Sequence, residues 1–232
     1  VHALNLPENE EMFFGNICIV IAKAARAISS NAQIDYEKLY QLFDAIKGLP
    51  FHRNSKWYSV MLGALHKGFK ESFRYTELID WWGLENLKQE DFQKETLPNG
   101  KEMMSLSEQV YIAYAKHLLP KQTQFGEVIF NKDKVEVFMP LLDELIENYP
   151  DFQYPPYFKA KLLLATGDHD NVLSAFLPFA KKKRNDFWVW DVLSEVFEGE
   201  EDKIIACYSK ALSCRISDRK STRLNSSHGI IS

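Results

Sequence analysis

Three acidic side chains lie close together in one predicted helix, where a pair of carboxylates could act as general acid and base. Asp143 and Glu147 are four residues apart and therefore share a helix face, with Glu144 beside them. Acid and base catalysis needs the reacting groups within hydrogen-bond reach of each other or of a nucleophile. No histidine or nucleophile occurs in the same frame, and acidic pairs of this kind are typical of a solvated helix face. The sequence therefore predicts no catalytic residue and no small-molecule substrate.

Histidine and cysteine are the other residues that could carry chemistry. None falls in a metal-ligand spacing with another, and no glycine-rich phosphate loop occurs, so we expect no metal and no cofactor. Cys207 and Cys214 are seven residues apart, or about 10 Å along a helix, which is too far for a disulfide between them. We expect buried thiols in a reducing cytoplasm. The residues considered are His2, His52, His66, His117, His169, Cys18, Cys207 and Cys214.

Composition limits the class of protein. A chain of 232 residues with 46% hydrophobic and 26% charged residues can bury a core, so it is not intrinsically disordered. Apolar residues recur at helical spacing over long runs, and only 10 Gly and 9 Pro interrupt them, which predicts an all-helical fold. The formal charge of -4 provides no basic footprint for nucleic acid. No uninterrupted apolar run has the roughly 18 residues of a membrane span, so we expect no membrane partner.

The helices repeat at a fixed interval near the C-terminal end. Ala160 and Ser194 are both small, are 34 residues apart, and each precedes an apolar residue by three positions. The segment Trp190-x2-Leu193-Ser194-x2-Phe197, then Ile204-x3-Tyr208-x2-Ala211, fills the large and small positions of a 34-residue helical repeat. The interval from Phe197 to Ile204 is two residues short, which predicts a tightened turn around Gly199.

The second helices of three units share one frame. Counting back 34 residues from Val172, Phe176 and Phe179 gives Phe138, Leu142 and Leu145. Amphipathic helices in general would explain each apolar pattern alone, but they would not explain a frame common to all three.

This frame resembles the tetratricopeptide repeat, whose period is 34 residues. The resemblance implies an all-α fold, an α-solenoid of antiparallel helix pairs forming a superhelix, with clearest repeats at 153–186 and 187–217. It also implies a concave groove, lined by first helices, that holds a peptide or partner protein. We therefore expect a non-enzymatic scaffold for protein–protein interaction. The predicted groove residues are Tyr154, Tyr157, Lys161, Leu164, Trp188, Asp191 and Glu195.

Two pairs of tryptophan residues can each be interpreted as core residues or as surface residues. Adjacent helical residues point about 100° apart, so one ring of Trp81-Trp82, and one of Trp188 and Trp190, can be core while its companion lies at a surface or repeat interface. Core packing is the simpler reading, although exposed tryptophan is a common interaction anchor.

Earlier parts of the chain continue the helical pattern. Small residues such as Gly15, Gly63 and Ala64 would permit close helix packing. A weaker segment between Gly83 and Met104 contains the turn Pro98-Asn99-Gly100 and predicts a loop or short helix. The expected helices are 10–29, a helix capped by Asp35, 57–69, 73–82, and one opened by the capping box Ser105-x-x-Glu108, with an insertion at 120–131.

The amino-acid sequences of two segments suggest a narrower resemblance. Residues 57–82 and 155–190, including Tyr154-Pro155-Pro156-Tyr157 and Asn185-Asp186-Phe187-Trp188, resemble an uncharacterised family of bacterial tetratricopeptide proteins. Some of its members occur in defence-type gene sets and have a C-terminal cold-shock, OB-like domain. The alternative function implied is therefore an accessory subunit of a bacterial nucleic-acid-processing or defence system. The basic run Lys181-Lys182-Lys183-Arg184 is better read as a solvated helix end.

Both ends of the sequence suggest a fragment. The chain opens at Val1, in the middle of a repeat pattern, and residues 218–232 resemble a translated sequencing adapter. We therefore expect a helical domain at 1–217 and a non-native, disordered tail at 218–232. Truncation of the array predicts that Ile205, Tyr208 and Leu212 expose apolar surface in a frayed last helix.

Overall fold

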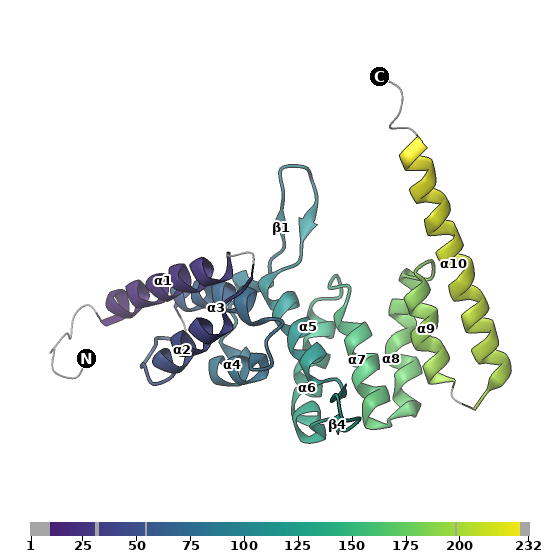
Figure 1. Ribbon diagram of the computed structural model, residues 1–232, viewed down its shortest axis with the longest axis horizontal. Helices are drawn as coiled ribbons and strands as arrows, with labels where there is room; N and C mark the ends of the chain where they lie inside the picture. Colours follow the sequence, from purple (N-terminus) through teal and green to yellow (C-terminus); the bar gives the residue numbers. More distant parts are fainter. Residues whose placement is uncertain (1–9, 31–32, 54, 198, 228–232) are drawn as a thin grey trace. The chain divides into compact units, whose positions relative to one another are not determined.

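Helices dominate the computed structural model, which describes residues 10–227 except 31–32, 54 and 198, with side chains of the last helix described as far as Cys214. Helix accounts for 69% of the chain and strand for 4%, so the all-α class is confirmed. The chain divides into two compact units, Val1–His117 and Leu118–Ser232. Figure 1 shows their elements in sequence colours.

The first unit contains five helices and one β-hairpin among its described residues. Short 3-10 turns connect the fourth helix to the hairpin. The elements are α1 (Glu10–Ser29), α2 (Tyr36–Ile46), α3 (Lys56–Phe69), α4 (Tyr75–Trp82), η1 (Leu84–Asn86), η2 (Gln89–Phe92), β1 (Glu95–Thr96), β2 (Glu102–Met103) and α5 (Leu106–Leu118), whose last residue lies past the division.

Close packing of α1 along α3 forms the centre of the first unit. A Cβ placed on Gly15 would lie 2.7 Å from the Trp57 indole, so the glycine permits the approach of the two helices. Gly68 has the same role nearby, because its Cβ would lie 2.5 Å from Ser29 Oγ. Gly63, for which close packing was predicted, has only the Leu106 side chain near it, at 3.8 Å. The sequence thus identified one of the two tight glycines.

Charged side chains connect α2 to the beginning of α4. The Arg74 guanidinium binds both oxygens of Asp44, at 3.0 and 2.6 Å, and Glu77 at 2.6 Å. Lys47 also pairs with Glu77. Hydrogen bonds from Arg74 lower the pKa of Asp44 and of Glu77 to about 2. Both carboxylates therefore remain ionised down to strongly acidic pH.

Buried aromatic groups connect α3, α4 and α5. His66 Nδ1 lies 2.7 Å from the Tyr75 hydroxyl, and the Tyr75 ring packs 5.2 Å from the His117 ring. Tyr114 donates to Asp80 at 2.6 Å. Trp82 is fully buried and stacks on Tyr58. These contacts place the α5 helix against α4.

The segment between α4 and α5 forms a hairpin where the sequence predicted a loop or short helix. Its strands pair antiparallel, with Glu95 opposite Met103, and the predicted turn at Pro98-Asn99-Gly100 closes it. Gly100 has a φ of +78°, a conformation that glycine adopts without strain. Figure 1 shows this hairpin extending away from the helices of its unit.

The second unit begins with a small hairpin, at the position of the predicted insertion, and continues as helices joined by short connections. Its elements are β3 (Lys121–Gln122), β4 (Val128–Ile129), α6 (Lys132–Asn148), α7 (Pro155–Thr166), α8 (His169–Lys182), α9 (Phe187–Val196) and α10 (Glu201–Ser227). Adjacent helices pack as pairs, most extensively α7 with α8 and α9 with α10. This arrangement is consistent with a helical-repeat protein.

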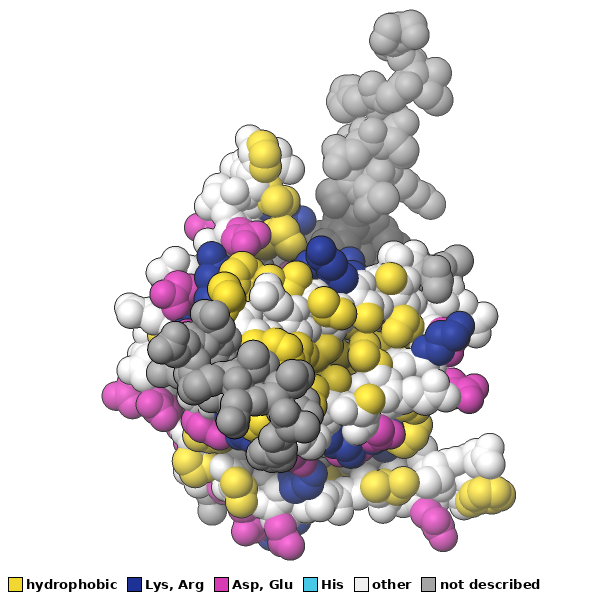
Figure 2. Space-filling model, turned by 90° about the vertical axis from the view of Figure 1, so that its left-hand side faces the viewer, with side chains coloured by type: hydrophobic (Ala, Val, Ile, Leu, Met, Phe, Trp, Pro, Cys, Tyr) yellow, Lys and Arg dark blue, Asp and Glu magenta, His cyan; other side chains and the backbone are white. Residues whose placement is uncertain are grey.

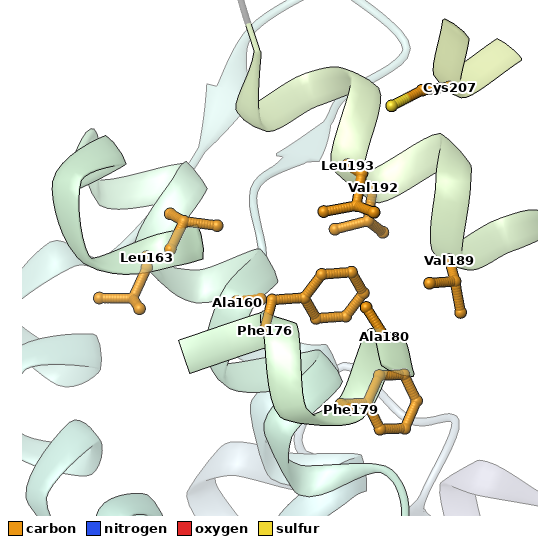
Figure 3. Packing of buried hydrophobic residues seen from close by; sticks show 10 residues of the cluster. Ala160, Leu163, Phe176, Phe179, Ala180, Val189, Val192, Leu193 and Cys207 are labelled. Atoms are coloured by element: carbon orange, nitrogen blue, oxygen red, sulfur yellow. The ribbon is translucent and has the colours of Figure 1, made fainter. Parts of the chain in front are cut away.

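Burial in the second unit follows the common frame in two of the three second helices. Phe138, Leu142 and Leu145 of α6 and their counterparts Val172, Phe176 and Phe179 of α8 are all exposed by 3% or less. Ala160 and Ser194, the predicted small residues, are also buried. Figure 3 shows the Phe176 ring pointing toward Val192 and Leu193 from α9, with Phe179 beside Ala180.

The frame shifts in α10. Cys207, Ala211 and Cys214 form its buried face, 35 residues after Val172, Phe176 and Phe179. Tyr208, assigned to a large core position by the sequence, is 50% exposed. The side chains of α10 that face α9 are instead the small Cys207, Ala211 and Cys214, which permit close approach of the two helices.

Exposure of the remaining apolar residues of α10 confirms one prediction. Ile205, Tyr208 and Leu212 are 61%, 50% and 60% exposed. The backbone of α10 is helical through Ser227, whereas the sequence predicted a frayed last helix and disorder from residue 218. The absence of Gly and Pro between 201 and 227 suits a continuous helix. That residues 218–232 are non-native stays a prediction, and 228–232 lie outside the described residues.

By length and composition, one helix among the described residues could cross a membrane. It is the segment Glu11–Ser29, with a mean hydropathy of 1.5. The core helix of a soluble protein passes the same test, and α1 buries Phe14, Cys18 and Ile21 in the first unit. Figure 2 shows hydrophobic side chains gathered in a band on one face, with charged groups around it. The segment is therefore weak support for a membrane span.

Two glycines of α3 provide a matched test of the packing. Gly68→Ala places a methyl group against Ser29 and Leu39, whereas Gly63→Ala meets only ordinary contact. Overpacking typically costs about 1–3 kcal/mol, and an unstrained helical Gly→Ala change gains about 0.5–1 kcal/mol. We expect Gly68→Ala to lower the free energy of unfolding relative to Gly63→Ala, measured by urea denaturation. Equal stabilities would contradict the close approach of α1 and α3.

The His66 imidazole predicts a pH dependence of stability. Burial lowers the pKa of His66 from its usual value of 6.5 to about 4. Below pH 6.5 the unfolded chain binds a proton that the folded chain does not, so stability decreases from pH 6.5 to about 4 and is constant with respect to this group above 6.5. The full loss is about 3 kcal/mol. Unfolding curves of wild type and His66→Gln across this range test it, and parallel pH profiles would exclude the effect.

Candidate functional site

The seven predicted groove residues lie on two helices. Tyr154 caps the N-terminus of α7, and the other six lie within α7 or α9. Helix α7 starts with Pro155 and Pro156, whose fixed φ suits a first turn, and ends at Gly167 with a φ of +81°. Helix α9 begins after Asp186. Four of the residues follow one face of α7 at intervals of three or four positions, and three follow α9 in the same way.

Contacts between these helices join residues one repeat apart. The Tyr154 and Trp188 rings stack with centroids 6.4 Å apart, and Lys161 Nζ binds Glu195 at 2.8 and 3.0 Å. Each pair is separated by 34 residues. Tyr157 lies against Trp188, and Asp191 follows Trp188 by three positions on the same face of α9. The structure thus brings six of the seven residues together, and we call this surface the α7–α9 strip.

Aromatic packing fixes the first half of the strip. Trp188 meets Tyr157 edge-on at 5.1 Å and Phe179 at 5.5 Å, and Tyr157 also lies 6.4 Å from Phe176. Tyr157 and Trp188 are half-buried against the hydrophobic core. Both readings of Trp188 therefore apply in part, because its ring packs on the core while part of it reaches the surface. The contribution of Phe176 and Phe179 was identified from the sequence only as core burial.

The second half of the strip is polar. Asp191 and Glu195 are exposed, and Lys161 is half-buried in its ion pair. Among the described residues, Asp191 forms no ion pair. Leu164, the seventh residue, is half-buried and packs against the core. The strip therefore combines two aromatic edges with an available carboxylate.

Chemically, the strip offers aromatic rings, a phenol hydroxyl and a carboxylate. Burial is the main cause that raises the pKa of Tyr157, so its hydroxyl is neutral and can donate a hydrogen bond at physiological pH. In the part of the chain that is described, no three His, Cys, Asp or Glu side chains gather as a metal site would require. Asp143, of the acidic pair on α6, instead forms an ion pair with Lys159 at 2.5 Å.

The fold and the strip define a protein of packed helix pairs. Residues 153–227 match the model of a family described as a domain of unknown function, DUF7017, which takes in the four helices α7–α10. That description names no tetratricopeptide family and no defence system. No curated protein matches the chain, and no solved structure matches it.

Proposed function

We propose that the chain is a non-enzymatic scaffold of tetratricopeptide type that binds a peptide or partner protein along the α7–α9 strip. The observation that supports this is the register of the strip, in which side chains one repeat apart meet across two helices. A surface built in this way presents neighbouring aromatic and charged groups to one extended partner.

The chemistry of the strip favours one kind of partner segment. Tyr154, Tyr157 and Trp188 offer aromatic edges, which suit an apolar or cationic side chain. The exposed Asp191 carboxylate lies next to them and suits Lys or Arg. Glu195 is already neutralised by Lys161. We therefore expect a partner segment with a basic residue beside an apolar one, and a cytoplasmic setting for the pair.

Truncating the aromatic residues would be an ambiguous test, because Tyr157 and Trp188 also pack on the core. Reversing the exposed charge avoids this difficulty. Asp191→Lys changes the strip without removing a buried group, and Glu144→Lys makes the same change at an exposed position of α6. Exposed substitutions of this kind usually alter stability by less than about 0.5 kcal/mol.

The test uses a phage-displayed library of random 12-residue peptides selected on the whole chain. We expect enriched peptides to contain basic and apolar residues, and their affinity, measured by fluorescence anisotropy, to fall at least tenfold in Asp191→Lys and to stay unchanged in Glu144→Lys. Loss of a charged contact of this kind costs about 1.5–3 kcal/mol. Failure of Asp191→Lys to weaken any enriched peptide would reject the strip as the binding surface.

A further inference from the structure

A concave surface lies in the first unit, where the sequence indicated no site. It is a cavity of about 550 Å³ between α3, the first turn of α5 and the segment that leads into and out of the β1–β2 hairpin. Ligand sites in proteins have volumes of about 300–1,000 Å³. We call this surface the hairpin cleft. Figure 1 shows how the hairpin rises from the connection between α4 and α5.

Hydrogen bonds hold the walls of the cleft in place. The Ser59 hydroxyl donates to Asp91 at 2.8 Å, and the same carboxylate oxygen accepts the Lys88 backbone N–H at 2.9 Å. On the other side, the Gln109 amide donates to the Met104 carbonyl at 2.8 Å. Both ends of the hairpin segment are therefore attached to helices, and the cleft is formed before a ligand arrives.

The floor of the cleft is apolar and open. Val60, Gly63 and Leu106 line it, and the absence of a side chain on Gly63 leaves the Leu106 methyl groups as its nearest neighbours. Met103 and Met104 line the hairpin side, each 44% exposed. Methionine side chains are flexible and adapt to different apolar partners. The floor thus suits a large apolar side chain.

Charges of both signs surround this floor without neutralising one another. Arg26 from α1, Lys56 from α3 and Lys88 contribute basic groups to the lining, and Glu90 and Glu95 contribute acidic groups. Within the described part of the chain, none of these five forms an ion pair. Since exposed charges lose little by remaining solvated, they are free to pair with a ligand that has both signs of charge.

We propose that the hairpin cleft binds an extended peptide segment of a partner protein, in which a large apolar residue is flanked by acidic and basic residues. The apolar side chain enters over Gly63, the acidic flank meets Arg26 and Lys56, and the basic flank meets Glu90 and Glu95. This site is separate from the α7–α9 strip and does not depend on the strip being functional.

Gly63 provides a sharp test, because a side chain added there enters the cleft. Gly63→Phe fills the floor, whereas Gly63→Ala adds one methyl group that has room. A second variant, Arg26→Glu with Lys56→Glu, alters only exposed side chains. The probes are 12-residue peptides selected from a phage-displayed random library on the wild-type chain, with affinities measured by fluorescence anisotropy.

A class of selected peptides is expected to lose at least tenfold in affinity with Gly63→Phe and with the double charge variant, and to keep its affinity with Gly63→Ala and Asp191→Lys. Circular dichroism of each variant shows that the fold is retained. Peptides that lose affinity only with Asp191→Lys would support the strip and overturn the cleft. Selection of no peptide sensitive to Gly63→Phe or to the double charge variant would also overturn it.

Discussion

Each helix of this protein can bury only one stripe of its surface against its own partner, so the remaining apolar surface must be covered by the next pair. In the second unit this requirement produces the 34-residue register. Phe138, Leu142 and Leu145 of α6 and the same positions of α8 face inward, and Tyr154 meets Trp188 one repeat later. The same repeat register therefore determines which residues of each helix are buried and which lie at its surface.

The periodicity of the apolar residues predicted the features of the fold that depend on helical spacing alone. The all-α class, the helical spans and the inward positions of α6 and α8 follow from apolar residues at helical spacing. The register of α10 does not, because Tyr208 and Cys207 are adjacent and both could serve as the contact residue. The choice depends on how closely α9 and α10 approach, which is a property of the packed pair. For the same reason the sequence could not show whether a neighbouring helix approaches Gly63. It predicted close packing there because the residue is small, whereas the structure places Gly63 in an open cleft.

The candidate surfaces differ in how visible they are in the sequence. The α7–α9 strip was predicted because its residues keep the repeat frame. The hairpin cleft combines α1, α3, α5 and a segment with no helical pattern, and its residues span Arg26 to Gln109. The packing of α1 on α3 and the hydrogen bonds of Asp91 and Gln109 bring them together. The segment inserted between α4 and α5 thus adds a concave surface that no repeat pattern contains.

Residues in the repeat frame hold α9 against α7 and α8, and amide hydrogen exchange measures how firmly these helices are held. Trp188→Ala removes a half-buried ring that contacts Tyr157 and Phe179, whereas Tyr208→Ala removes an exposed ring of α10. We expect Trp188→Ala to lower the opening free energy of α7–α9 by about 2–4 kcal/mol, and Tyr208→Ala to change it by less than about 0.5 kcal/mol. Equal effects of the two variants, or no effect of Trp188→Ala, would contradict it.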